Sequence, residues 1–424
     1  MGLPLTHAFA QAGYGLGSPA VPKSMCADTA IELPALRLKY GAERSLGSPP
    51  DSSTCLSAGG FSPPPAAPEY AHMGSIVFCG VFPAIVVAML FATAANDDLV
   101  AEDFQQFYRA AVAILHGRTA YPDLGAVPQT VWGGPYPYPP LPALVTTPLT
   151  VLSFNAAGLV MMALLVATAL AIPFVLGVRD WRCYGLAFLW PPVLSAIQTG
   201  NITLPLGLCA AFAWRYRDRL VPASAAVGVT LAAKLFLWPL VVWFAATKRT
   251  ATAVAASAVG VGLLVASWAV IRFDGLLGYP DRLRRLDRTL GEDSYTTYIV
   301  GLDVGLPSLL ARLLWLGLGV GVLAAVVVLA RRGDERTAFV LALCAALALT
   351  PIVWLHYFAL LSVVVALAQP RLGLVWFIPL GMYVTPGSGH PTPFQTSWTL
   401  AVALVTIGLA VRAARSFDLR PVPA

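Results

Sequence analysis

The chain has 424 residues, of which 58% are hydrophobic and only 11% are charged. A soluble domain carries roughly 25% charged residues, so this composition excludes a chain that is water-soluble along its whole length. The net charge is +6, but Lys and Arg are spread over many short loops, which argues against a nucleic-acid-binding domain. The six cysteines form no CxxC pair, so we expect neither a disulfide framework nor a structural zinc.

The first 72 residues differ from the rest of the chain. They are rich in Pro, Ser and Gly and contain no apolar run as long as the core of a signal peptide. We expect residues 1–72 to be a disordered tail. Met73 stands directly before the first apolar run, so a start assigned too early is one explanation of this tail. Residues 73–415 form the predicted membrane domain, and residues 416–424 a short C-terminal tail.

Apolar runs recur from residue 75 onward. A run of about 20 residues crosses a hydrocarbon core of ~30 Å as a helix, because backbone polar groups in lipid must be satisfied within the segment. The predicted fold is therefore an all-α polytopic membrane protein with about 12 transmembrane helices. The predicted crossings are 75–95, 141–153, 155–177, 183–197, 201–214, 222–246, 251–271, 305–330, 337–352, 355–369, 372–385 and 397–413.

Loop charges give a divided prediction of orientation. If the N-terminus is cytoplasmic, simple alternation places the loops 96–140 and 272–304 outside. Lys and Arg favour cytoplasmic loops, and the same count places Lys248, Arg249, Arg331, Arg332, Arg336, Arg412, Arg415 and Arg420 inside. It also places Arg179, Arg182, Arg215, Arg217 and Arg219 outside, against this tendency.

The loop after the first crossing contains an amphipathic pattern. Phe104, Phe107, Tyr108, Ala111 and Leu115 recur at the spacing of one helix face. Gly117 is well placed to end that helix. A short helix with one apolar face directly after a crossing is expected to lie on the outer membrane surface.

Four carboxylates precede or open this helix, at Asp97, Asp98, Glu102 and Asp103. A structural interpretation makes Asp103 an N-cap and the others interfacial charge. A functional interpretation makes one of them a general base, because a carboxylate beside a membrane cavity can take a proton from a hydroxyl. Spacing alone leaves both interpretations open.

The run from Tyr136 to Pro142 reads YPYPPLP and is predicted to be extended, since each Pro removes a donor and restricts the preceding residue. Its tyrosines are typical of an aromatic belt at a membrane boundary.

Polar residues interrupt three other apolar runs. Lys234 is the lone lysine within a predicted crossing, where a charge is costly and needs a partner or a purpose; the structural alternative is snorkelling to the interface. His356 and Tyr357 stand at a predicted boundary, where a satisfied interfacial residue is the simpler interpretation. Gln198-Thr-Gly-Asn201 separates two short runs and is typical of a turn between helices.

Together these motifs resemble a known family. Asp-Phe-x-x-Phe-Tyr-x-Ala-Ala from Asp103, Gly-x-x-x-Tyr at 117–121 and Tyr-Pro-Pro at 138–140 are similar to polyprenol-phosphate-mannose-dependent α-1,2-mannosyltransferases. These are multi-pass glycosyltransferases of family 87 with the GT-C fold, and the likeness extends over most of 73–415. The run Ala-Ala-Lys with a later Pro at 232–239, the run from Thr350 to Tyr357, and Gln198 to Asn201 resemble further family elements. The family's Asn-Gln-Ser element is not found in 272–304.

The resemblance implies an active site on the outer face of the plasma membrane. It implies Asp103 as general base, with Asp98 and Glu102 as alternates, and Lys234 and His356 at the donor phosphate. Tyr108, Tyr138, Gln198, Asn201 and Tyr357 are the expected substrate-binding residues. The donor would be a sugar on polyprenyl phosphate and the acceptor a glycolipid or glycan. No cofactor is expected, and the sequence does not decide whether a divalent metal is needed.

Two alternatives stay open. A polyprenyl-phosphate arabinofuranosyltransferase would have a similar sequence. A lipid or glycan transporter would also be polytopic, but transporters often contain inverted repeats, and no convincing repeat is present here.

Overall fold

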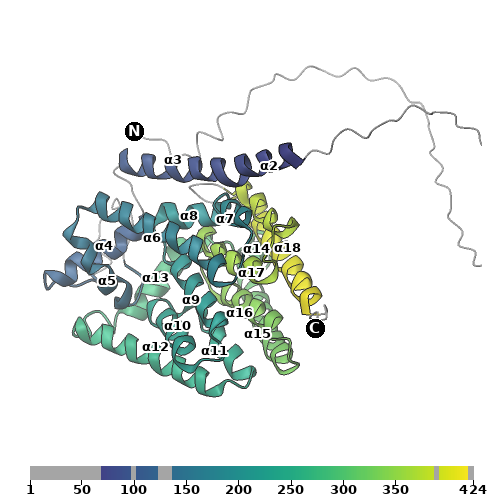
Figure 1. Ribbon diagram of the computed structural model, residues 1–424. Coiled ribbons are helices and arrows are strands. Elements are labelled where there is room, and N and C mark those ends of the chain that lie inside the picture. Colours follow the sequence, from purple (N-terminus) through teal and green to yellow (C-terminus); the bar gives the residue numbers. More distant parts are fainter. Residues whose placement is uncertain (1–67, 97–101, 123–135, 386–390, 419–424) are drawn as a thin grey trace, which may run out of the picture.

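The computed structural model describes residues 68–96, 102–122, 136–385 and 391–418, and within these ranges it contains helices and no β-strand. In chain order the elements are α2 (Pro68–Ile76), η1 (Val77–Val81), α3 (Phe82–Asn96), α4 (Glu102–Leu115), α5 (Pro140–Thr146), η2 (Thr147–Val151), α6 (Phe154–Val175), α7 (Trp181–Ala187), α8 (Pro191–Thr199), α9 (Thr203–Arg215), α10 (Leu220–Ala233), η3 (Leu235–Leu237), α11 (Pro239–Ala246), α12 (Thr250–Val270), α13 (Tyr279–Leu290), η4 (Gly291–Asp293), α14 (Thr297–Asp303), α15 (Ser308–Arg331), α16 (Glu335–Leu349), η5 (Leu355–Leu360), α17 (Leu361–Ala368), η6 (Leu374–Trp376), η7 (Ile378–Val384) and α18 (Pro393–Asp418). Figure 1 shows these helices packed side by side, with α4 and α5 toward the left of the view and the C-terminus on the right.

Length and composition identify several membrane-spanning candidates among these helices. Five are long and apolar enough to cross a bilayer: His72–Asn96, Phe154–Val175, Thr250–Val270, Ser308–Arg331 and Pro393–Ala414. Two bent pairs, α8 with α9 and α10 with η3–α11, raise the number to seven if each pair is one span. These helices support a multi-pass membrane protein, whereas the predicted count of about 12 is not confirmed.

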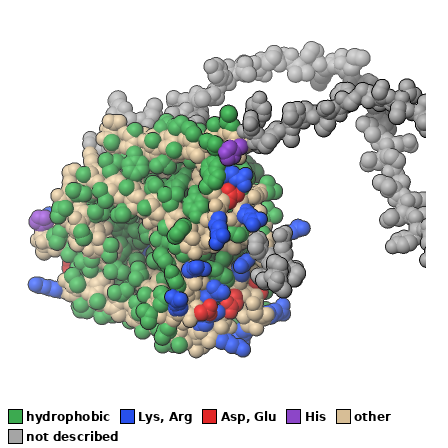
Figure 2. Space-filling view, viewed as in Figure 1, with side chains coloured by type: hydrophobic (Ala, Val, Ile, Leu, Met, Phe, Trp, Pro, Cys, Tyr) green, Lys and Arg blue, Asp and Glu red, His purple; other side chains and the backbone are tan. Residues whose placement is uncertain are grey.

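The surface of the long helices is apolar. Val261 of α12, Leu313 of α15 and Leu404 of α18 are each more than half exposed. Figure 2 shows hydrophobic side chains over most of the face it presents. Such a surface is unfavourable in water and is suited to contact with lipid chains.

The two bent pairs end their helices inside the bundle. α8 stops at Gly200, whose φ of +69° is the left-handed conformation that glycine adopts without strain, and the axis turns by 118° into α9. α10 stops at Lys234, which has extended backbone angles, and the axis turns by 117° into η3 and α11. Broken helices are tolerated at membrane depth where protein surrounds the break. Each break brings a polar residue, Asn201 or Lys234, into the interior.

Helix α4 occurs where the apolar spacing predicts a helix. Phe104, Phe107 and Ala111 are at most 1% exposed, because this face packs on α5, η2 and α6. Other parts of the protein therefore cover most of this face, and the position of α4 on the membrane surface stays a prediction.

The segment 141–153 is not a crossing. The Tyr138 ring, just before it, lies 4.8 Å from the Phe107 ring of α4, measured between centroids. Just after it, the Phe154 ring lies 6.2 Å from Phe104 of the same helix. A twelve-residue helix reaches only about 18 Å, and both α5 and η2 pack on α4, so Pro140–Val151 is too short to be among the spanning candidates.

The predicted single crossing 222–246 also needs correction. Asp218 precedes α10 and Arg249 follows α11, yet their side chains form an ion pair of 2.7 Å. The chain therefore goes in along α10, turns at Lys234 and returns to the same end along α11. Removing one crossing before Arg215 moves Arg215, Arg217 and Arg219 from the outside to the inside. Replacing the crossing 222–246 by a turn then leaves Lys248 and Arg249 on the inside, where they were predicted.

A charged network ties three turns together at this end of the helices. Glu335 at the start of α16 accepts hydrogen bonds from Arg249 at 2.9 Å and from Arg217 at 3.4 Å. Arg249 also binds Asp218, and Arg217 lies over the Trp214 ring. We call these turns, residues 216–219, 247–249 and 332–334, the basic end. Figure 2 shows Lys and Arg side chains gathered toward the right of the view, the side on which the C-terminus lies in Figure 1.

Removing the shared acceptor should weaken the fold. We expect Glu335→Gln to lower the stability of the detergent-solubilised protein by about 1 kcal/mol, because a neutral amide cannot hold two guanidinium groups. Thermal unfolding would measure this loss. Asp281→Asn, which removes an exposed carboxylate paired with Arg284 one helix turn away, is the matched control and should change Tm little. Equal unfolding temperatures for all three proteins would contradict a stabilising role of Glu335.

Candidate active site

The candidate site is built around a buried carboxylate. Asp103 is the second residue of α4 and is 7% exposed. Its Oδ2 accepts a hydrogen bond of 2.7 Å from Nδ2 of Asn201, which follows the break between α8 and α9. Packing of α4 through Phe104 and Phe107 holds the carboxylate against this break. Asp103 is therefore directed into the bundle.

Asn201 is fixed by its own neighbour. Its Oδ1 accepts hydrogen bonds from the backbone N–H of Thr203 at 2.9 Å and from the Thr203 hydroxyl at 2.6 Å. With the oxygen occupied in this way, the amide group can only present its NH₂ to Asp103. Thr203 was not predicted as a site residue. The sequence could have indicated this contact, because an Asn side chain commonly forms a hydrogen bond with the backbone two residues later.

His356 lies on the other side of the carboxylate. Its Nε2 is 3.8 Å from Oδ2 of Asp103, which is too long for a hydrogen bond but close enough for an ion pair when the ring is protonated. Nε2 has no hydrogen-bond partner among the described residues. The ring stacks on Tyr357 with 5.1 Å between centroids.

The segment before His356 is held by a second segment far away in the chain. The backbone N–H of Tyr295 donates to the carbonyl of Val353 at 2.7 Å, and the N–H of Val353 donates to Ser294 Oγ at 2.8 Å. Ser294 was not predicted, and a contact across 59 residues leaves no sequence signal. It positions the segment that carries His356.

Lys234 brings a cation to the same place. Its Nζ is buried without a hydrogen-bond partner among the described residues. The nitrogen lies 3.8 Å from the centre of the Tyr357 ring, 5.2 Å from that of Tyr138 and 5.7 Å from that of Phe236. Aromatic faces attract a cation, so these rings stabilise the ammonium while leaving its donors available. Lys234 lies inside the bundle rather than snorkelling to an interface.

Tyrosine hydroxyl groups hold the proline-rich segment that carries Tyr138. Tyr279 donates to the carbonyl of Pro137 at 2.8 Å, Tyr121 to that of Tyr138 at 2.8 Å, and Tyr136 to that of Pro139 at 2.6 Å. Proline prevents regular backbone hydrogen bonding in this segment. Three consecutive backbone carbonyl groups instead accept hydrogen bonds from tyrosine hydroxyl groups. This fixes the Tyr138 ring between Phe107 and Lys234.

The environment of Asp103 shifts its proton equilibrium. Burial raises the pKa of the carboxyl above its ordinary value of 3.8, while the Asn201 hydrogen bond and the Lys234 charge oppose that rise. A carboxylate with a raised pKa is a better proton acceptor than an exposed one. The cluster thus combines a base with a nearby lysine and histidine that can stabilise an anion.

The comparisons with known proteins identify the chain's relatives. The model for glycosyltransferase family 87 matches residues 136–356, just over half of the chain. The chain belongs to glycosyltransferase family 87. A relative from Mycolicibacterium smegmatis is 26% identical over 288 residues, covering 60% of this chain and 62% of the relative, so the match spans less than two thirds of the relative's length. It is named polyprenol-phosphate-mannose-dependent alpha-(1-2)-phosphatidylinositol pentamannoside mannosyltransferase. No solved structure matches the chain.

The match to family 87 covers most of the cluster but not its carboxylate. Tyr138, Asn201, Lys234 and His356 lie within it, and Asp103 lies before it. The structure brings all five, with Tyr357, to one place. This arrangement depends on α4, which precedes the matched residues 136–356 and packs against them.

Two predicted residues, Gln198 and Tyr108, do not join the cluster. Gln198 is exposed near the end of α8, as expected for part of a turn. Tyr108 donates to the carbonyl of Leu152 and packs on Phe154, so its side chain is engaged elsewhere. Asp98 lies outside the described residues, and Glu102 is within α4 but its side chain is not among those described.

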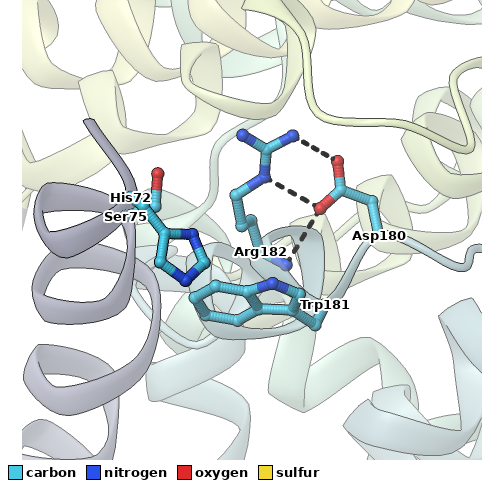
Figure 3. A pocket seen from close by; sticks show the side chains of 5 residues that line it. All are labelled: His72, Ser75, Asp180, Trp181 and Arg182. Carbon is cyan, nitrogen blue, oxygen red and sulfur yellow. Dashed lines mark hydrogen bonds and ion pairs between the residues drawn. The ribbon is translucent and has the colours of Figure 1, made fainter. Parts of the chain in front are cut away.

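Two other features of the described residues, their metal-binding potential and a cavity at the surface, do not involve the cluster. Within the described ranges, no three His, Cys, Asp or Glu side chains gather as a metal ion requires. A cavity of about 360 Å³ lies between α2 and α7 and is lined by His72, Ser75, Asp180, Trp181 and Arg182 (Figure 3). Its arginine is already paired with Asp180 at 2.9 Å, as the dashed lines show.

The contact between Asp103 and Asn201 can be tested by a double-mutant cycle. Asn201→Leu leaves a buried carboxylate without its donor and should cost about 1–3 kcal/mol of unfolding free energy. Adding Asp103→Leu removes the charge and should recover part of that loss. Thermal unfolding of the two single variants and the double variant measures the coupling. Additive effects within about 0.3 kcal/mol would show that the two side chains do not interact.

Proposed function

We propose that the protein transfers mannose from polyprenyl-phosphate mannose to a hydroxyl of a lipid-linked or glycan acceptor, with inversion at the anomeric carbon. The observation that carries this proposal is the meeting of Asp103, Lys234 and His356 in one buried cluster. The family and the mycobacterial relative support the reaction class. They also favour mannose over arabinofuranose as the sugar.

The proposed reaction assigns one role to each charged residue. Asp103 takes the proton of the acceptor hydroxyl, whose oxygen attacks the anomeric carbon from the face opposite the phosphate. The bond between that carbon and the phosphate oxygen breaks, and the electron pair leaves with polyprenyl phosphate. Lys234 and His356 stabilise the negative charge on the departing phosphate. Since phosphate leaves without being protonated, one carboxylate is enough, unlike the pair used in glycoside hydrolysis.

The cluster is closed in this structure. Oδ2 of Asp103 and Nε2 of His356 are only 3.8 Å apart, so no sugar ring fits between base and histidine. Donor binding must therefore move α4 and the segment with His356 apart. In the closed form the carboxylate lies beside the lysine that later meets the phosphate, which limits the cost of burying either charge.

Charge distribution supports an outward-facing site. Arg215 lies at the far end of α9 from Asn201, and Arg219 at the far end of α10 from Lys234. A helix of 13 or 14 residues spans about 20 Å, so the cluster lies about two thirds of a hydrocarbon core away from the basic end. Lys and Arg favour cytoplasmic turns, which supports a cluster that faces the outside. An outward-facing site needs a lipid-carried donor, because nucleotide sugars are made in the cytoplasm.

Transfer should depend on the proposed base. We expect membranes containing the wild type to transfer radiolabelled mannose from polyprenyl-phosphate mannose to a mannolipid mixture. Asp103→Asn, at equal protein level, should be at least about 100-fold slower, while the control Asp281→Asn should match the wild type. Full transfer by Asp103→Asn would contradict this assignment and point to Asp98 or Glu102. If no variant transfers mannose, the arabinofuranose donor is the next test, and failure there would favour a transporter.

The pH dependence of transfer should report the same carboxyl group. Asp103 must be ionised to accept a proton, so kcat/KM should fall as the pH drops through its raised pKa. Asn201 stabilises the ionised form, so Asn201→Ala should raise that pKa further and move the acid limb of the profile to higher pH. Profiles of both proteins between pH 4 and pH 8 would measure the shift. If the acid limb of the Asn201→Ala profile stays in place or moves to lower pH, this interpretation is wrong.

A further inference from the structure

Three buried polar atoms in or next to the cluster have no hydrogen-bond partner among the described residues. Two of them are Nζ of Lys234 and Nε2 of His356, to which the proposed reaction brings a phosphate. The third is Oε1 of Gln106 in α4, to which that reaction as stated brings nothing. An unpaired buried carbonyl oxygen costs free energy, because folding removes the water that would otherwise bond it. Gln106 is therefore a candidate contact for a substrate.

Gln106 lies beside the proposed base on the same helix. It follows Asp103 by three residues in α4, and side chains three apart on a helix are neighbours, with about 5–6 Å between their Cβ atoms. Ala110, one further turn along, continues the same strip of the helix. Asp103 is 7% exposed and Ala110 is 4% exposed, so this strip faces the interior. Gln106 is half-buried, and its oxygen is on the buried side.

The chemistry of the amide favours a hydroxyl group as the ligand of Gln106. An amide oxygen only accepts hydrogen bonds, so an anionic phosphate, which is also an acceptor, does not satisfy it. A hydroxyl both donates and accepts, so it suits the amide group in either orientation. In the proposed reaction the hydroxyl groups belong to the sugars, whereas the polyprenyl chain and its ionised phosphate offer none. A sugar hydroxyl is therefore the ligand that fits Gln106.

The position of Gln106 points to the acceptor sugar rather than the donor sugar. Asp103 takes the proton of the attacking hydroxyl, so that hydroxyl lies against the carboxylate. When α4 moves to admit substrates, Gln106 stays beside Asp103, because both belong to one helix. Hydroxyl groups on adjacent carbons of a sugar ring are close enough for two neighbouring side chains to bind them together. The donor phosphate lies instead against Lys234 and His356 in that reaction.

We propose that Oε1 of Gln106 accepts a hydrogen bond from the acceptor hydroxyl next to the one that attacks. Asp103 and Gln106 together then select a sugar that carries two adjacent hydroxyl groups, and Gln106 helps to decide which hydroxyl is glycosylated. This inference rests on the proposed function, because it names a specificity-determining residue for that reaction. It also explains the unpaired oxygen, which gains its partner when the acceptor binds.

The test compares octyl mannoside with its deoxy analogues, each of which lacks one ring hydroxyl. We expect the wild type to use the analogue without the adjacent hydroxyl about tenfold less well by kcat/KM, because the buried oxygen then stays unpaired. Gln106→Leu should use octyl mannoside about tenfold less well, mainly through a higher KM, and should no longer distinguish it from that analogue. Gln105→Leu is the matched control, since Gln105 lies on the other side of the helix from Asp103. If Gln106→Leu discriminates among the analogues as the wild type does, the inference is overturned.

Thermal unfolding separates this inference from the proposed reaction. Leucine leaves no polar atom unpaired, so Gln106→Leu should raise the unfolding temperature of the purified protein by about 1–3 °C. Octyl mannoside, compared with the deoxy analogue, should stabilise the wild type more than Gln106→Leu. If both results appear but no mannose is transferred, the inference stands and the proposed function fails. A lower unfolding temperature for Gln106→Leu, or equal stabilisation of both proteins, would show that Gln106 is structural and that the inference is wrong.

Discussion

The hydrogen bond between Asn201 and Asp103 is the interaction on which the rest of the site depends. Burying a carboxylate without a partner costs several kcal/mol of folding free energy. Helix α4 can therefore pack inward only if a hydrogen-bond donor lies next to Asp103. Asn201 supplies the donor, Thr203 fixes its direction, and Lys234 adds a compensating charge. The same arrangement that makes burial of Asp103 tolerable also keeps it apart from bulk water, where it would be a poor base.

Two helix breaks make this arrangement possible. A continuous helix directs its polar backbone groups along its axis and offers the interior only side chains. Stopping α8 at Gly200 and α10 at Lys234 places Asn201 and the lysine at turning points, where their side chains meet α4 from different directions. Gly200, Asn201 and the Nζ atom of Lys234 are buried, and irregular backbone persists at membrane depth where protein surrounds it.

The breaks also explain the loop charges. Because α10 and α11 return to the same end, Arg217, Asp218, Arg249 and Glu335 meet in one network rather than on opposite sides of a membrane. Arg217 and Arg219, which simple alternation left on the wrong side, belong to this end. The sequence-based count was misled twice, once by treating Pro140–Val151 as a crossing and once by treating 222–246 as a single one. A length-based count cannot detect a segment that turns back.

Sequence alone determined the helical class, the family resemblance and the residue types of the site. Apolar runs too long for a soluble core require helices in lipid, and a lone lysine or histidine within such runs is costly enough to be noticed. Lys234 and His356 stood out in this way, and the family resemblance added Asp103, Asn201, Tyr138 and Tyr357. Only the tertiary structure decided that they meet, that Gln198 stays outside, and that Thr203 and Ser294 orient their neighbours. The physical reason is that a side chain's partner is set by packing between segments distant in the chain, as in the bond between Ser294 and Val353, and local patterns do not record such packing.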